Sequence, residues 1–118
     1  MPKKTDEETV LQVQDGDTES FGILVERYEA KMMRYAHRFL FGYHDAEDLM
    51  QEVFIKAYTN IQSFDTKRRF SSWLYRIAHN EFINAIKRKD QRLEVMNSRF
   101  ENGSKRGFHR GFGMGFRL

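Results

Sequence analysis

Apolar side chains recur every three or four residues along most of this chain, and almost nothing interrupts them. The single proline is residue 2, and only three of the eight glycines come before residue 103. Proline and glycine are the residues that most disfavour helix interiors, so their scarcity leaves room for long helices. No segment shows the strict alternation of a half-buried strand. We therefore expect an all-α fold, a compact bundle of about four helices with a flexible C-terminal tail.

Local signals predict where the helices begin. Thr5-Asp6-Glu7-Glu8 has the pattern of a capping box, with Thr5 as N-cap and Glu8 reaching back to it. The first predicted helix runs from Thr5 to about Gln14, and the second is capped by Asp17 or Thr18 and runs to about Phe39. The third runs from Asp45 to Ile61, and the fourth from Ser71 to about Arg92. Each longer helix carries one apolar stripe, which predicts one shared core.

The last residues differ in character from the rest. Residues 97–118, NSRFENGSKRGFHRGFGMGFRL, contain five of the eight glycines and show no helical period. We expect a helical domain over residues 1–95 and a Gly/Phe/Arg-rich flexible tail over 96–118. Such tracts bind nucleic acid without sequence preference in some proteins and are simply disordered in many others.

Charge is divided unevenly along the chain. Residues 1–61 hold 7 Lys and Arg against 12 Asp and Glu, whereas residues 62–118 hold 13 against 5. The basic half suits phosphates. There is no cysteine, which excludes disulfides and thiolate metal sites and fits a cytoplasmic location. No apolar run approaches the roughly 20 residues of a membrane span, and the N-terminus lacks the apolar stretch of a secretory signal.

The predicted third helix carries an acidic face. Asp48 and Glu52 lie four residues apart, with Gln51 beside them and Asp45 one turn earlier. The face suits a basic helical partner, or, with His44, a divalent cation. A third reading is that acidic residues complement the helix dipole, which explains Asp45 but not Glu52, since Glu52 lies beyond the first turn.

A basic and aromatic stretch, RRFSSWLYRIAHN, covers residues 68–80. Trp73, Arg76 and Asn80 fall on one face of the predicted fourth helix, because they are spaced by three and four. Cations neutralise phosphates, aromatic rings stack on unpaired bases, and an Asn amide can read a base edge. Alternatively, Trp73 is a core anchor and the arginines only face solvent. The basic loop before the helix and Lys87-Arg88-Lys89 after it favour nucleic acid.

The ordered combination of these motifs resembles a known family. DAEDLMQEVFIKAY followed by FDTKRRFSSWLYRIAHN is similar to region two of bacterial RNA polymerase sigma factors of the extracytoplasmic-function (ECF) group. The earlier ESFGILVERYEAKMMRYAHRFL fits the opening helix of that region. The resemblance spans residues 8–92. No single motif would be as specific as their order.

The resemblance implies a non-enzymatic transcription initiation module, without cofactor or metal, that has two tasks. It would bind the clamp helices of the core RNA polymerase β′ subunit, and it would recognise and melt the −10 element of promoter DNA. An anti-sigma factor is a further implied partner. By motif match, the polymerase-binding residues are Asp45, Asp48, Gln51, Glu52 and Phe54. The DNA-binding residues are Phe64, Lys67, Arg68, Arg69, Trp73, Tyr75, Arg76, Asn80, Lys87 and Arg88.

Two departures from the family qualify this interpretation. Members usually carry a second helical domain that reads the −35 element, and nothing after residue 92 resembles one. The chain is then a truncated piece, a shifted-frame product or a lone region-two protein. Asn84 also stands where an acidic residue is common. The alternatives are a general single-strand nucleic-acid binder, a helical bundle that binds only polymerase or an anti-sigma factor and, remotely, a carboxylate-metal enzyme.

Overall fold

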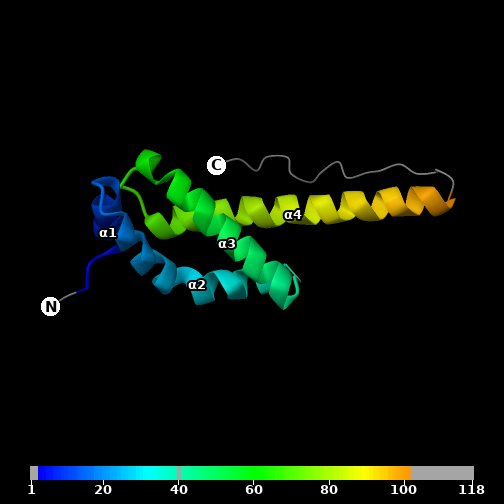
Figure 1. The fold of residues 1–118 in the computed structure, drawn as a ribbon, viewed down its shortest axis with the longest axis horizontal. Coiled ribbons are helices and arrows are strands. Elements are labelled where there is room, and N and C mark those ends of the chain that lie inside the picture. Colours follow the sequence, from blue (N-terminus) through cyan, green and yellow to red (C-terminus); the bar gives the residue numbers. More distant parts are fainter. Residues whose placement is uncertain (1–2, 40, 102–118) are drawn as a thin grey trace.

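The computed structural model describes residues 3–39 and 41–101, with side chains described up to residue 90. It contains four α-helices, α1 (Asp6–Gln14), α2 (Phe21–His37), α3 (Tyr43–Thr59) and α4 (Phe70–Glu101), and two short 3₁₀ turns, η1 (Thr18–Ser20) and η2 (Ile61–Ser63) (Figure 1). Over the described ranges no strand occurs, so the predicted all-α fold is confirmed.

The start of α1 forms as predicted. The Thr5 hydroxyl accepts a hydrogen bond from the Glu8 N–H at 3.1 Å, and the Thr5 N–H donates to the Glu8 carboxylate at 2.9 Å. Both bonds satisfy N–H groups that a helix start leaves without partners. The helix ends before Gly16, whose φ of 112° is a left-handed conformation that favours glycine.

The other three helix starts differ from prediction. A 3₁₀ turn precedes α2, which begins at Phe21 without a side-chain cap. Helix α3 begins at Tyr43, two residues before the predicted cap Asp45, again without a side-chain cap. Helix α4 begins at Phe70, and its N–H donates to the Glu7 carboxylate of α1 at 2.7 Å. The cap of α4 therefore comes from a distant helix and not from the predicted Ser71.

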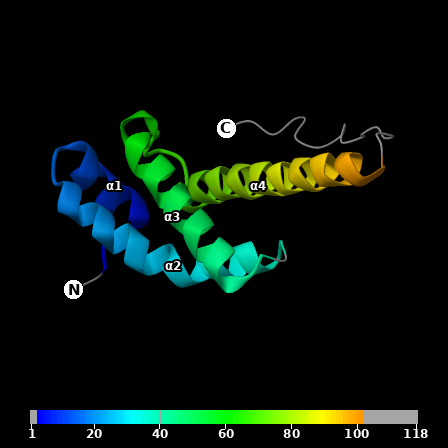
Figure 2. The ribbon, with the colours of Figure 1, turned by 45° about the vertical axis from the view of Figure 1, so that its right-hand side comes forward.

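Helix α3 packs against both α2 and α4, and α1 covers the end of the bundle where α4 begins (Figures 1 and 2). The predicted apolar stripes meet in one core. Its largest fully buried side chains are Phe70, Phe82, Leu24, Met32, Leu74 and Ile77. Burying a side chain of this size contributes about 1.5–3 kcal/mol, so the core is the main source of stability.

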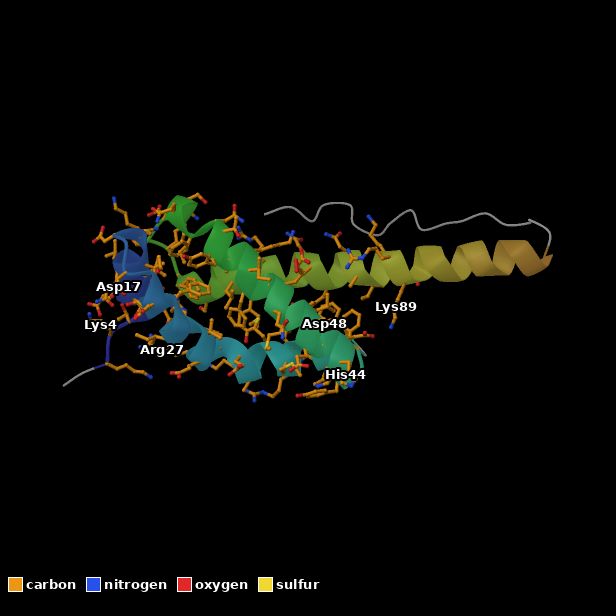
Figure 3. All side chains as sticks on the ribbon, in the orientation of Figure 1. Lys4, Asp17, Arg27, His44, Asp48 and Lys89 are labelled. Carbon is orange, nitrogen blue, oxygen red and sulfur yellow. The ribbon has the colours of Figure 1, made fainter. Side chains whose placement is uncertain are left out.

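Polar contacts attach α1 to α2. The Arg27 guanidinium lies 2.7 Å from the Asp6 carboxylate, and the Tyr28 hydroxyl donates to the same carboxylate. Figure 3 shows Arg27 near the blue N-terminal end of the bundle, whereas His44 and Asp48 lie at the opposite end of the α2–α3 pair. Burial, together with the hydrogen bond to Asp6, raises the pKa of Tyr28 above its ordinary value.

Helix α4 is longer than predicted. It continues past the other helices to Glu101, whereas the sequence suggested an end near Arg92 (Figure 1). Residues 96–101, assigned to the tail, are helical. The rest of the predicted tail, residues 102–118, lies outside the described residues.

Candidate nucleic-acid interface

The loop between η2 and α4 and the first two turns of α4 enclose an open groove, which we call the base groove. Its lining residues are Ser63, Phe64, Asp65, Arg68, Arg69, Ser72, Trp73 and Arg76. Five of the ten residues predicted to bind DNA therefore lie around one hollow.

Trp73 has an intermediate position between core and surface. Its indole is partly buried, with the ring centroid 4.9 Å from that of Phe64 and 5.8 Å from that of Phe70. Phe64 and Phe70 are themselves buried, at 6% and 0% exposure. Phe64 is thus a support beneath the indole and not an exposed platform. Both interpretations of Trp73 from the sequence are therefore partly correct. The indole packs on buried rings, as a core anchor does, and it also lines the base groove.

Exposed cations surround the base groove. Lys67, Arg68 and Arg69 are exposed in the loop, and Arg76 is exposed on α4. Asp65 shapes the loop, because its carboxylate accepts a hydrogen bond from the Lys67 N–H at 2.9 Å. It also lies 3.8 Å from the Arg68 guanidinium, but both side chains are more than half exposed and such pairs contribute little. The loop therefore keeps its positive charge available.

The remaining predicted DNA contacts are dispersed. Asn80 is partly buried one turn after Arg76, and Lys87 is partly buried two turns further along α4. Tyr75 lies outside the base groove, with its ring centroid 5.1 Å from that of Tyr35 on α2. Tyr75 lines a second hollow, which we call the α2 groove, together with Lys31, Arg34, Tyr35, His37 and Arg38.

Sequence reasoning missed the cations of the α2 groove. Lys31, Arg34 and Arg38 are spaced by three and four, so a search for basic faces on the second helix would have found them. Tyr35, which lies among them, is partly buried, and its hydroxyl is 3.2 Å from the Nδ1 atom of His79. Burial raises the pKa of Tyr35, an effect that Arg38 opposes.

The predicted polymerase-binding residues separate into two groups. Asp45, Asp48, Gln51 and Glu52 are exposed on α3. Phe54 is 8% exposed and makes an edge contact with Phe21 of α2, at a centroid distance of 6.5 Å. Phe54 is therefore part of the core. Among the described side chains, no group of three or more His, Asp or Glu is placed to hold a metal ion.

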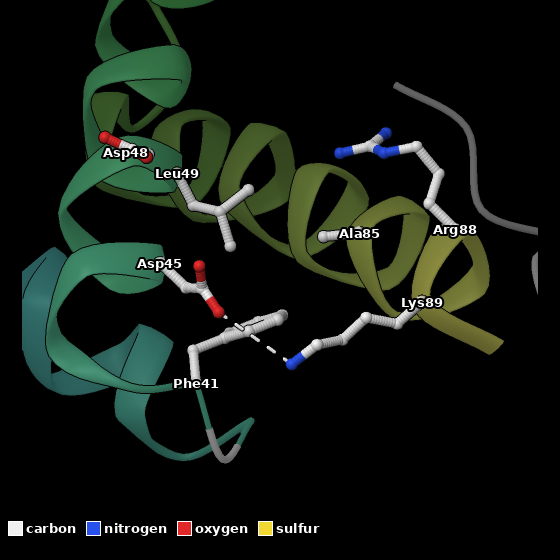
Figure 4. A pocket seen from close by; sticks show the side chains of 7 residues that line it. All are labelled: Phe41, Asp45, Asp48, Leu49, Ala85, Arg88 and Lys89. Atoms are coloured by element: carbon white, nitrogen blue, oxygen red, sulfur yellow. Dashed lines mark ion pairs between the residues drawn. The ribbon is translucent and has the colours of Figure 1, made fainter. Parts of the chain in front are cut away.

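The acidic and basic surfaces meet at one point. Asp45 and Asp48 of α3 and Arg88 and Lys89 of α4 line one hollow, with apolar walls between them (Figure 4). The Lys89 ammonium lies 3.8 Å from the Asp45 carboxylate and 5.5 Å from the ring centroid of Phe41. Arg88 was predicted to contact DNA, yet it borders the acidic face. At this end of the molecule, the acidic side chains of α3 and the basic side chains of α4 are therefore adjacent.

Comparisons with known proteins point to one family. The family model of sigma-70 region 2 matches residues 24–92. The ECF RNA polymerase sigma factor SigW of Bacillus subtilis is 48% identical over 80 residues, which cover 68% of this chain and 43% of SigW. The ECF sigma-E factor of Haemophilus influenzae is 41% identical over 88 residues, or 75% of this chain and 46% of that protein. The chain thus spans less than half the length of these relatives.

Two solved structures are also similar. The NMR structure of an engineered region 2 of sigmaE in complex with GTAAAA has a TM-score of 0.73 and 43% identity, covering 80% of this chain and 99% of that one. The structure of CnrH in complex with the cytosolic domain of CnrY has a TM-score of 0.65 and 30% identity, covering 69% and 53%. In the part of the chain that the structure describes, no helix is long and apolar enough to cross a membrane. The motifs, the helical fold and the matched residues 24–92 agree, and the chain belongs to the sigma-70 region 2 family, with ECF sigma factors as its relatives.

Proposed function

We propose that this chain is a transcription initiation module that binds core RNA polymerase and recognises and melts the −10 promoter element, without enzymatic activity of its own. The observation that carries the proposal is the base groove, in which a partly buried indole lies among exposed arginines. An engineered region 2 of sigmaE, which has the same fold, has been solved in complex with GTAAAA, which supports a nucleic-acid ligand for this groove. A cytoplasmic location follows from this role.

The base groove would favour an opened strand over a duplex. Extruding a base from a duplex costs a few kcal/mol. Stacking on an aromatic ring returns about 1–3 kcal/mol per base, and Trp73 is the ring available in the groove. Arg68, Arg69 and Arg76 would neutralise the phosphates that flank the base. Asn80, one turn further, would contact a base edge through its amide.

The outward side of α3 would bind polymerase. Asp48, Gln51 and Glu52 are exposed there, and they suit the basic β′ clamp helices that the family resemblance implies. Asp45 is exposed at the edge of this set, with the Lys89 ammonium 3.8 Å from its carboxylate. Phe54 would act indirectly, by holding α3 against α2. The CnrH structure with the CnrY cytosolic domain supports an anti-sigma factor as a further partner.

Strand binding tests the DNA part of the proposal. Fluorescence anisotropy should show tighter binding of labelled GTAAAA than of a scrambled strand at matched salt. Trp73→Ala and Asn80→Ala should each weaken binding at least about fivefold, because one stacked base or one amide contact is worth about 1–3 kcal/mol. Tyr43→Ala, an exposed ring outside the groove, is the control. Equal affinity for both strands would favour the alternative, a non-specific single-strand binder.

Polymerase capture tests the other part. Glu52→Lys should abolish binding to core polymerase, because it places a cation against a basic partner. Trp73→Ala should retain polymerase, fail to open a duplex promoter and regain transcription on a premelted one. A bundle that only binds protein would instead lose all function in Glu52→Lys and none in Trp73→Ala. Loss of polymerase binding in a folded Trp73→Ala protein would refute the assignment of separate surfaces.

A further inference from the structure

The α2 groove carries positive charge that nothing in the described structure neutralises. Lys31 and Arg34 of α2 and Arg38, the residue that follows the helix, are exposed, and no ion pair joins any of them to a carboxylate of a described residue. Cations in the last turn of a helix complement its dipole, which accounts for Arg34. It does not account for Lys31, which lies further from the helix end and whose ammonium is 5.2 Å from the ring centroid of Tyr28, a contact that leaves its charge without a counter-ion. Like charges at this spacing repel each other, and an anion would relieve the repulsion.

The floor of the α2 groove is aromatic. The rings of Tyr35 and Tyr75 meet edge to face, with an interplanar angle of 76°, and both side chains are partly buried. The groove therefore combines flat rings below with cations at the rim, as the base groove does. A free phosphate would use only the cations. A nucleotide would use both, because its base stacks on a ring while its phosphate contacts a guanidinium.

The two grooves are neighbours on α4. Ser72 lines the base groove and Tyr75 lines the α2 groove. Residues three apart lie on the same side of a helix, and the rise between them is about 4.5 Å. A strand that leaves the base groove past Ser72 would therefore reach the α2 groove without crossing the molecule.

We propose that the α2 groove binds the continuation of the same opened strand, with phosphates on Lys31, Arg34 and Arg38 and a base against Tyr75. This inference rests on the proposed function, since it takes its strand from the base groove. It adds a second binding surface, on α2, to the residues that the sequence motifs indicate.

Strands of different length test the proposal. The probes are GTAAAA, the same hexamer with six thymidines added at the 5′ end, and the same with six added at the 3′ end. One extension, and only one, should raise affinity. Each phosphate contact to a single strand adds about 0.7 to the salt dependence of binding, so three contacts should add about 2.

Removing two of the cations should remove most of that gain. For the extended strand, Arg34→Ala/Arg38→Ala should lower the slope of log affinity against log salt concentration by about 1.4. The ratio of the affinity in about 50 mM salt to that in about 200 mM salt should therefore be about sevenfold smaller than for the wild-type protein. The affinity of the double variant for the bare hexamer should stay within about twofold of the wild-type value, because the base groove is intact. Lys3→Ala/Lys4→Ala removes the same charge outside the groove and should leave both affinities unchanged. Circular dichroism verifies that each variant is folded.

The outcomes separate the two proposals. Wild-type protein that does not bind the hexamer refutes the proposed function. Wild-type protein that binds the hexamer but gains nothing from either extension overturns the α2 groove alone. Equal weakening of hexamer and extended strand in the double variant would indicate a general charge effect and would also overturn it. If a duplex extension raises affinity and a single-stranded one does not, or if the groove binds an acidic peptide and neither extension, the groove belongs to another partner and the proposal is overturned.

Discussion

Replacing Glu7 by alanine removes the carboxylate that receives the first N–H of α4. Glu7 lies in α1, and its Oε2 atom accepts the Phe70 N–H at 2.7 Å across 63 residues of sequence. Helix starts carry partial positive charge, so an anionic acceptor there is doubly favourable. The same bond fixes the position from which Arg69 and Trp73 enter the base groove.

The expected loss of stability can be estimated from this geometry. Losing an N-cap side chain costs about 0.5–2 kcal/mol, and a hydrogen bond to a charged group is worth about 1.5–3 kcal/mol. Glu7 is only partly buried, so solvent would replace some of the interaction, and about 1.5 kcal/mol is the expected loss for Glu7→Ala. For a domain of this size, that loss lowers Tm by about 6–12 °C. Glu7→Gln, which keeps an acceptor but no charge, should lose about half as much.

Urea and thermal unfolding followed by circular dichroism would measure the effect. Glu26→Ala removes an exposed carboxylate from α2 and serves as the matched control. The Glu7 variants should also bind GTAAAA more weakly, because the groove wall is less well held. If Glu7→Ala and Glu26→Ala unfold at the same midpoint, the carboxylate does not cap α4 in solution and this reasoning is refuted.

Three further perturbations test other contacts. Gln14→Ala should cost about 1–2 kcal/mol in urea unfolding and weaken hexamer binding, because the Gln14 amide donates to the Ile61 and Phe64 carbonyls at 2.8 and 3.0 Å; unchanged values for both would contradict this. Phe70→Ala empties a fully buried site and should cost about 3–5 kcal/mol, whereas Phe70→Leu should cost less. The raised pKa of Tyr28 means that the folded state holds this proton more tightly than the unfolded state, whose phenol titrates near pH 10. Stability from this group is complete below about pH 10 and declines above it, so Tyr28→Phe should flatten the alkaline decline while losing about 1 kcal/mol at neutral pH.

The helices were predictable because their signals are local. The apolar stripes and the capping box of Thr5 and Glu8 depend on residues a few positions apart, and both predictions hold. The start of α4 was not predictable in the same way, since Glu7 and Phe70 are far apart in sequence. Ser71 was predicted as the cap because serine is a preferred N-cap residue. In the structure the Glu7 carboxylate of another helix accepts the first N–H instead.

The site was predictable in outline and less so in detail. Exposure of Arg68, Arg69 and Arg76 around one groove agrees with the motif. Tyr75 was grouped with Trp73 because both belong to the motif, although residues two apart on a helix point in different directions. Phe54 was assigned to the polymerase-binding residues by motif match, but α3 packs on two sides and the second contact buries it. The DNA and polymerase roles of these residues remain predictions.

The rings beneath the base groove affect the thermodynamics of binding. Tyr28, Phe70, Phe64 and Trp73 form an unbroken series of ring contacts from the interior of the bundle to the groove wall. An indole held in this way has already lost most of its rotamer freedom before a ligand arrives, and that entropy was lost during folding. Preorganisation of this kind raises affinity by lowering the cost of association and leaves the contacts themselves unchanged. Replacing Phe64 by a smaller residue would leave the indole more mobile. The entropy of strand binding should therefore become less favourable by more than the enthalpy does.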